Sequence, residues 1–143
     1  MSYAYLATPY TEYPDGLDIA NREACHAAAW LLRRGVPLFC PIAHSHAIGT
    51  IGDLPLKDHS LWLPAGEPFM DTATVLVICH MPTWQTSYGI SEEVKKFKAA
   101  GKPIVDMPWP MRNAQEFLTK LEEACPKIKK AMRLFLKKRN EQS

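Results

Sequence analysis

The segment that most constrains the fold is an uninterrupted apolar run, Val-Leu-Val-Ile-Cys, at residues 75–79. A strand with one face in water alternates apolar and polar residues, whereas a strand buried on both faces does not. Burial on both faces is typical of a central parallel strand, because its connecting helices cover the sheet on each side. The run therefore predicts an α/β protein with a parallel sheet between layers of helices.

The remaining elements alternate between strand and helix along the chain. Short apolar runs predict further strands at residues 3–7, 36–40 and 103–105. Helical periodicity and stop signals predict helices at residues 17–34, 88–100 and 113–124, and a basic helix after Pro126. Alternation of this kind favours one sheet with right-handed crossovers.

Residues 44–68 have poor periodicity and several Gly and Pro residues, so we predict a long, partly helical excursion outside the core. At most one helical turn is expected at residues 69–73. Long irregular segments in compact domains are usually functional. Because ligands bind beyond the carboxyl ends of parallel strands, residues 8–22, 41–46 and 80–93 are the places to look for a site.

Length and charge indicate a single domain and give no support for a nucleic-acid partner. A chain of 143 residues fits one domain, and a net charge of +2 gives no electrostatic argument for a nucleic-acid partner. The basic residues do gather in the last helix, at Lys127, Lys129, Lys130, Arg133, Lys137, Lys138 and Arg139. Two interpretations stay open, a patch for nucleic acid or membrane and the solvated face of a docked helix, and the apolar Ile128, Met132 and Phe135 favour the second.

The expected location is the cytoplasm. No apolar run reaches the ~20 residues of a membrane span, and the N-terminus lacks the basic start and apolar core of a signal peptide. The four cysteines, Cys25, Cys40, Cys79 and Cys125, show no metal-like spacing and stand in apolar contexts. Buried free thiols are therefore favoured over two disulfides.

The helix after the 75–79 strand carries the most informative polar residues. Glu93 has Ile90 three residues before it and Phe97 four residues after it, so its carboxylate flanks the apolar face, where burial raises a pKa. Glu92 lies about 100° away and is expected to pair with Lys96. Gly89 lets a ligand approach the backbone, and Ser87 with the first amides of the helix is suited to an anion. A plain preference of acids for a helix start is the competing interpretation.

Two further clusters lie at the expected strand ends. His44, Ser45 and His46 follow the second strand, and a ligand-binding polar loop is favoured there over a metal site, since no partner ligand has diagnostic spacing. Tyr5, Tyr10 and Arg22 belong to the first strand and the segment after it. Tyr10 is placed to stack on a base or bond a hydroxyl, and Arg22 to pair with phosphate or with a surface acid.

The long excursion supplies candidate acids and aromatic walls. Any of Asp53, Asp58, Glu67 and Asp71 is placed to act as an acid/base or to orient a sugar hydroxyl. Trp62 and Trp84 would suit the wall of a pocket for a planar base, or the core. Dinucleotide and triphosphate fingerprints are absent, and no metal or organic cofactor is expected.

Taken in order, these segments resemble the nucleoside 2-deoxyribosyltransferase superfamily, and within it a group of small bacterial and phage proteins called DUF1937. The matching pieces are Tyr5-Leu6-Ala7-Thr8-Pro9-Tyr10, Arg22, Phe39-Cys40-Pro41-Ile42-Ala43-His44-Ser45-His46, Pro82-Thr83-Trp84-Gln85-Thr86-Ser87-Tyr88-Gly89, Glu93 and Gly101-Lys102-Pro103. They run over residues 3–105. The resemblance divides the chain into a deoxyribosyltransferase-like domain at residues 1–110 and a C-terminal helical extension at 111–143, packed on that domain.

The resemblance implies a flavodoxin-like (Rossmann-like) three-layer sandwich with a central parallel sheet, in a homodimer or homotetramer with shared active sites. In that superfamily the Glu of a Ser-x-Gly-x-x-x-Glu segment attacks the anomeric carbon of a nucleoside or nucleotide. Ser87, Gly89 and Glu93 fit the segment here. The implied activity is N-glycosidic bond hydrolysis or transfer on a (deoxy)nucleoside or its 5′-monophosphate, through a covalent ester on Glu93.

One departure from the superfamily pattern concerns the acid/base. The Asp expected before the third strand falls on Gly66, so Glu67 or Asp71 would have to replace it. Ser87 would hold the phosphate or ribose, and Tyr5, Tyr10, Arg22, His44, Ser45, His46, Asp58, Trp84 and Gly89 would bind the substrate. The alternative is a nucleotide-binding or sensing protein of the same fold that has no turnover.

Overall fold

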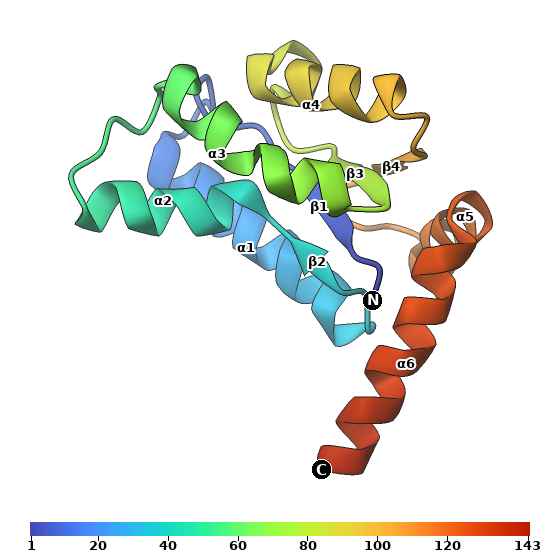
Figure 1. Cartoon of the computed structure of the whole chain (residues 1–143). Coiled ribbons are helices and arrows are strands. Elements are labelled where there is room, and N and C mark those ends of the chain that lie inside the picture. Colours follow the sequence, from blue (N-terminus) through green and yellow to red (C-terminus); the bar gives the residue numbers. More distant parts are fainter.

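The sheet of the protein has four parallel strands with helices on both faces (Figure 1). A computed structural model describes all 143 residues. The strands are β1 (Ala4–Ala7), β2 (Leu38–Phe39), β3 (Val75–Cys79) and β4 (Ile104–Met107), in the order β2-β1-β3-β4. Every pairing is parallel, for example Tyr5 with Leu76 and Val77 with Val105. This is the start of the flavodoxin-like strand order, so the predicted fold is confirmed.

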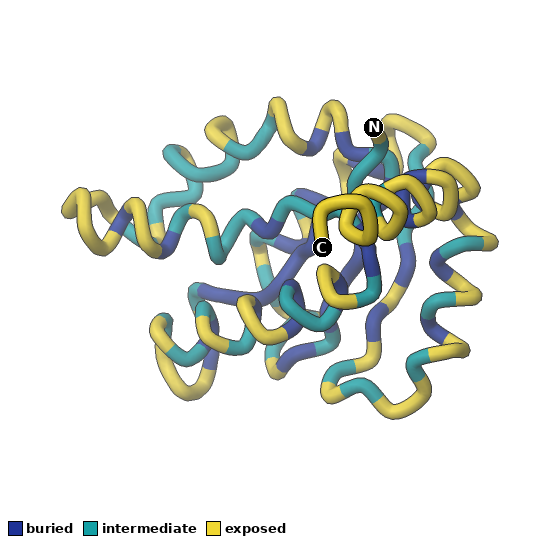
Figure 2. Tube along the Cα trace, turned by 90° about the horizontal axis from the view of Figure 1, so that it is seen from below, coloured by how far each residue is buried: buried dark blue, intermediate teal, exposed yellow.

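Strand β3 is fully buried, as its apolar run predicts. Successive side chains point to opposite faces, so Val75, Val77 and Cys79 join one hydrophobic cluster while Leu76 and Ile78 join another. Helices α1 (Leu17–Arg33), α5 (Ala114–Ala124) and α6 (Pro126–Gln142) cover the first face, and α3 (His59–Thr72) and α4 (Tyr88–Ala99) the second. Buried positions accordingly follow the sheet and the inner sides of the helices (Figure 2).

Helix α1 approaches the sheet closely because its buried face is made of small side chains, Ala20, Ala24, Ala27 and Ala28, with Leu31 at its end. The chain then turns into β2 at Gly35, whose φ of 82° favours glycine. A Cβ at Gly35 would lie 2.6 Å from Cγ of Leu136, so this turn also admits α6 against α1.

The partly helical excursion predicted at residues 44–68 is confirmed, whereas the polar loop predicted at 41–46 was wrong. The polar loop expected at 41–46 is the start of α2 (Pro41–Ile51), where Pro41 takes the first helical position and needs no amide partner. The irregular excursion ends in a 14-residue helix, α3, whose last turn is the single turn expected at 69–73. Pro64 and Pro68 lie inside α3, and packing of the helix on the sheet offsets their cost.

Smaller differences concern strand length and the loop before α4. The second strand spans two residues rather than the expected 36–40, and β4 extends to Met107. The loop before α4 contains a 3-10 turn, η1 (Trp84–Thr86). Cys40, Cys79 and Cys125 are buried free thiols as predicted, whereas Cys25 is exposed on α1. No helix has both the length and the hydropathy that a membrane crossing requires.

The C-terminal helices share the core of the sheet domain. Phe117 and Leu121 of α5 and Ile128 and Met132 of α6 belong to the cluster that contains the β1, β3 and β4 side chains. The basic residues of α6 occupy its exposed turns (Figure 2). Helix α5 and the first half of α6 therefore pack on the sheet, and the exposed second half of α6 extends past it to Leu136, beside Gly35 (Figure 1).

Candidate functional site

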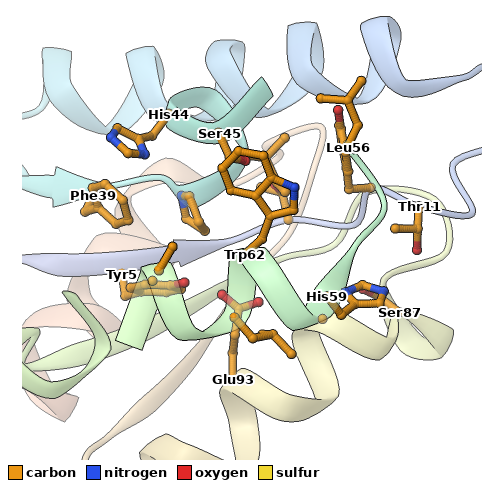
Figure 3. A pocket seen from close by; sticks show the side chains of 18 residues that line it. Tyr5, Thr11, Phe39, His44, Ser45, Leu56, His59, Trp62, Ser87 and Glu93 are labelled. Carbon is orange, nitrogen blue, oxygen red and sulfur yellow. The ribbon is translucent and has the colours of Figure 1, made fainter. Parts of the chain in front are cut away.

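A cavity lies beyond the carboxyl ends of β1 and β2, between α2, α3 and the start of α4 (Figure 3). It holds about 790 Å³ of empty space, its open mouth included. Seven of the predicted site residues line it, namely Tyr5, Tyr10, His44, Ser45, Ser87, Gly89 and Glu93. The topology thus brings together side chains from β1, α2 and α4 that are far apart in the sequence.

Glu93 is the one acidic residue that lines the cavity. It is only 5% exposed although it lies in the second turn of α4, because Ile90 and Phe97 pack on the same face. Its carboxylate points into the cavity toward the hydroxyl of Tyr5 (Figure 3). Burial raises the pKa of Glu93 to about 8, and hydrogen bonding from Tyr5 opposes part of that rise. The carboxyl is thus shielded from water and open to a ligand.

Tyr5 holds Glu93 from the sheet side. Its ring packs between Phe39 and Phe97, with centroid distances of 5.8 and 5.7 Å. Burial, followed by the charge of Glu93, raises the pKa of Tyr5 far above its ordinary value, so its hydroxyl stays protonated. On its other side the hydroxyl meets Gly66, where a Cβ would lie 3.4 Å from the oxygen. Tyr5 is therefore a fixed donor beside the carboxylate.

Tyr10, His46 and Asp18 form a chain of hydrogen bonds beside the cavity. The Tyr10 hydroxyl lies 2.5 Å from Nδ1 of His46, and Nε2 of His46 lies 3.0 Å from Oδ1 of Asp18. Burial and the charge of Asp18 raise the pKa of Tyr10 to about 12. His46 itself does not line the cavity, so its contact with the cavity runs through Tyr10.

Ser87 and Thr8 offer hydroxyl groups at the cavity wall. Ser87 caps α4 and accepts a hydrogen bond from the amide of Ile90 at 3.3 Å. Thr8 follows β1 and is 4% exposed, and its hydroxyl has no hydrogen-bond partner. An unpaired buried hydroxyl costs free energy that a ligand group can recover. Both residues therefore suit a polar ligand.

Six predicted site residues lie outside the cavity lining, namely His46, described above, and Glu67, Asp71, Arg22, Asp58 and Trp84. Glu67 pairs with Lys96 on the outer side of α3 and α4, and Glu92 pairs with Lys95 instead of the expected Lys96. Asp71 is exposed at the end of α3, before β3 begins, and so lies at the opposite edge of the sheet.

Arg22, Asp58 and Trp84 have other surroundings. Arg22 is exposed on α1. Asp58 caps α3 by accepting hydrogen bonds from the amide and hydroxyl of Ser60, and these bonds lower its pKa. Trp84 stacks on His80 at 3.9 Å, and His80 in turn bonds Asp106. None of these three side chains lines the cavity: Arg22 faces solvent, and Asp58 and Trp84 are engaged by neighbouring residues.

Several lining residues had no sequence signal or only a weak one. Trp62 was a candidate wall, and it projects over the cavity with its Nε1 bonded to the Pro55 carbonyl (Figure 3). The wall that α3 and the preceding turn provide was not predicted, because the partly helical excursion had no predicted helix bounds; the wall comprises Leu56, His59, Leu63, Ala65 and Gly66. Thr8 and Thr11 also line the cavity and were not predicted as site residues, although both follow the first predicted strand.

No three His, Cys, Asp or Glu side chains converge as a metal site. Fold and cavity together define an α/β protein with a small-molecule type of cavity at the carboxyl edge of a parallel sheet. Residues 2–108 match the model of a family described as a domain of unknown function, DUF1937, and the chain belongs to that family. The match runs from β1 to the end of β4 and includes the whole cavity lining, whereas α5 and α6 lie outside it. No curated protein matches the chain.

Proposed function

We propose that this protein breaks the N-glycosidic bond of a nucleoside or nucleoside 5′-monophosphate, with Glu93 as nucleophile. The observation that carries the proposal is the buried carboxylate of Glu93, which opens into the cavity as its single acidic group. The resemblance to the nucleoside 2-deoxyribosyltransferase superfamily supplies the reaction class. Transfer of the sugar to another base makes a transferase, and transfer to water makes a hydrolase.

The residues around Glu93 suit the chemistry. Its carboxylate oxygen would bond to the anomeric carbon while the bond to the base breaks, and the resulting ester splits one displacement into two steps. Tyr5 supports the charged form of Glu93 by hydrogen bonding. The Ser87 hydroxyl, the first amides of α4 and the unpaired hydroxyl of Thr8 suit the phosphate and sugar oxygens. Trp62, Phe39 and Leu56 offer apolar walls for a base.

The experiment is incubation of the protein with a panel of nucleosides and nucleoside 5′-monophosphates, with liquid chromatography of the free base. We expect base release by the wild type and none by Glu93→Gln. Glu92→Gln is the matched control, because Glu92 is the adjacent acid and pairs with Lys95 outside the cavity lining. Full base release by Glu93→Gln with an intact fold would contradict the proposal.

A second function, nucleotide binding without turnover, has one observation in its favour. Neither Glu67 nor Asp71 reaches the cavity, and Gly66 lines it where the superfamily pattern expects an acid. Calorimetry with the same panel separates the two functions. Tight binding of a nucleotide with no base release would favour the sensor.

A further inference from the structure

The chain of hydrogen bonds from Asp18 through His46 to Tyr10 connects bulk solvent to the cavity. Its outer end is open, since the side chain of Asp18 is 93% exposed, whereas that of His46 is 9% exposed. Its inner end is the Tyr10 hydroxyl, from a residue that lines the cavity with Glu93. Tyr10 comes from the β1–α1 connection, Asp18 from α1 and His46 from α2, so three segments build one line of donors and acceptors.

The partners fix the direction of these bonds. An ionised Asp18 only accepts, so Nε2 of His46 carries a proton and donates it to Oδ1. In neutral His46, Nδ1 then has a lone pair and accepts the Tyr10 proton. When His46 is protonated, Nδ1 donates to the Tyr10 oxygen, and the Tyr10 proton is free to point into the cavity. Protonated His46 therefore makes Tyr10 a donor toward a ligand.

The proposed reaction needs such a donor. A departing base takes both electrons of the broken bond and leaves more readily if a ring nitrogen gains a proton. Glu93 is occupied as nucleophile, and Glu67 and Asp71 lie outside the cavity. We infer that Tyr10 is the catalytic acid for the leaving base, and that His46, held by Asp18, is the positioning residue that resupplies its proton. The inference rests on the proposed function.

The step balances within the chain. The Glu93 oxygen bonds to the anomeric carbon, the bond to the base breaks, and its electron pair goes to the base. The base takes the Tyr10 proton, the Tyr10 oxygen takes the proton on Nδ1 of His46, and His46 becomes neutral while Nε2 stays bonded to Asp18. In the second step the attacking water or incoming base bonds to the anomeric carbon and the ester bond to Glu93 breaks. The proton that this nucleophile loses goes to the Tyr10 oxygen, as the Tyr10 proton returns to Nδ1 of His46.

Other titratable groups are differently engaged. Of those on the elements packed against His46, Asp18 and Tyr10 contact it, and Arg22 lies one turn beyond Asp18 at an exposed position of α1. Within the cavity, Tyr5 is committed to Glu93. His44 packs on Phe39, and His59 packs on Tyr88 at 4.7 Å. His44 and His59 have no carboxylate partner, unlike His46 with Asp18, and are the rival donors.

The test compares leaving groups. The panel nucleotide that gives most base release is paired with the 4-nitrophenyl glycoside of the same sugar phosphate, whose nitrophenolate leaves as a stable anion. We expect Tyr10→Phe and His46→Gln to lose about 10²–10⁴-fold in kcat/KM on the nucleotide, the usual contribution of a general acid. Both variants should release nitrophenolate at close to the wild-type rate. His26→Gln, an exposed position on α1, is the control and keeps both activities.

Equal losses on both substrates, or no loss on either, would overturn the assignment, since a binding or structural role does not depend on the leaving group. The same selective loss in His44→Gln or His59→Gln, with Tyr10→Phe unaffected, would transfer the role to that histidine. If Tyr10→Phe does not fold, His46→Gln decides alone. Failure of the wild type on both substrates contradicts the proposed function itself and is thus distinct from failure of this inference.

Discussion

At the scale of single residues, the burial of Glu93 lowers the stability of the folded protein. A carboxyl that is 5% exposed loses most of its hydration, and the Tyr5 hydroxyl returns only part of it. Residues with raised pKa values in a cavity are typical of functional sites. The arrangement is costly for folding and useful for chemistry, and both consequences are measurable.

The pH dependence of the reaction follows from the pKa of about 8 at Glu93. The nucleophile is the carboxylate, so kcat/KM for base release should rise as pH increases toward 8. In Tyr5→Phe the hydrogen bond that lowers this pKa is lost, so the rising limb should move to higher pH. Initial rates from pH 5 to 10 measure the rising limb of the wild type and that of Tyr5→Phe. A limb at the same pH in Tyr5→Phe would refute the assigned contact.

The same shift governs stability. Below the ordinary pKa of 4.5 both folded and unfolded Glu93 are protonated; above it the unfolded group ionises first, until the folded group follows near pH 8. Stability therefore falls between these values, by about 1.4 kcal/mol per pH unit. Glu93→Gln should be more stable than the wild type at pH 8 and similar at pH 4. Urea unfolding at both values checks this, and a variant that is less stable at pH 8 would contradict it.

At the scale of elements, the strands and four of the helices, α1, α4, α5 and α6, could be predicted from local patterns. The apolar run of β3, the Gly stops after α1 and α4 and the polar cap of α5 act within a few residues. Residues 44–68 were predicted to be partly helical, but the bounds of α2 and α3 were not predicted. Pro64 and Pro68 disfavour a helix interior locally, and only the tertiary packing of α3 against β3 and Tyr5 reverses that preference.

The site residues likewise divide into those that the fold class predicts and those that depend on tertiary packing. Residues after strand ends, such as Tyr10, His44 and Ser87, were identified because the fold class alone brings strand ends together. The wall formed by α3 and the partnership of His46 with Asp18 depend on how helices cross, which spacing does not encode. The acids Glu67 and Asp71 were predicted from their nearness in sequence to Gly66. Glu67 points toward Lys96 of α4, and Asp71 lies at the end of α3, at the opposite edge of the sheet.

The turn at Gly35 gives an element-scale prediction. Gly35→Ala places a Cβ both at a φ of 82° and against Leu136, whereas Gly101→Ala meets the first cost alone, at a φ of 65° with open space. Gly101→Ala should cost about 1 kcal/mol of unfolding free energy, and Gly35→Ala about 1 kcal/mol more. Adding Leu136→Ala should remove the extra cost. Equal costs in urea unfolding would show that α6 does not press on this turn.

At the scale of the whole molecule, the C-terminal helices complete the core although the DUF1937 match ends at residue 108. Removal of residues 126–143 would take Ile128, Ala131 and Met132 out of the larger hydrophobic cluster and expose part of it. We expect a large loss of Tm in thermal unfolding. Replacing Lys129, Lys130 and Lys137 by Gln should leave Tm nearly unchanged, since these side chains are exposed. Equal Tm values for the truncated and full chains would contradict the shared core.

The whole arrangement of sheet, cavity and shielded carboxylate is proposed to serve one event, formation of a sugar ester on Glu93. Mass spectrometry of the protein incubated with a 2-deoxy-2-fluoro nucleotide analogue, which slows release of the sugar, measures that event directly. The account predicts a gain equal to the sugar phosphate residue, located on the peptide that contains Glu93 and absent from Glu93→Gln. Base release with no adduct on that peptide, or an adduct on another side chain, would contradict the account.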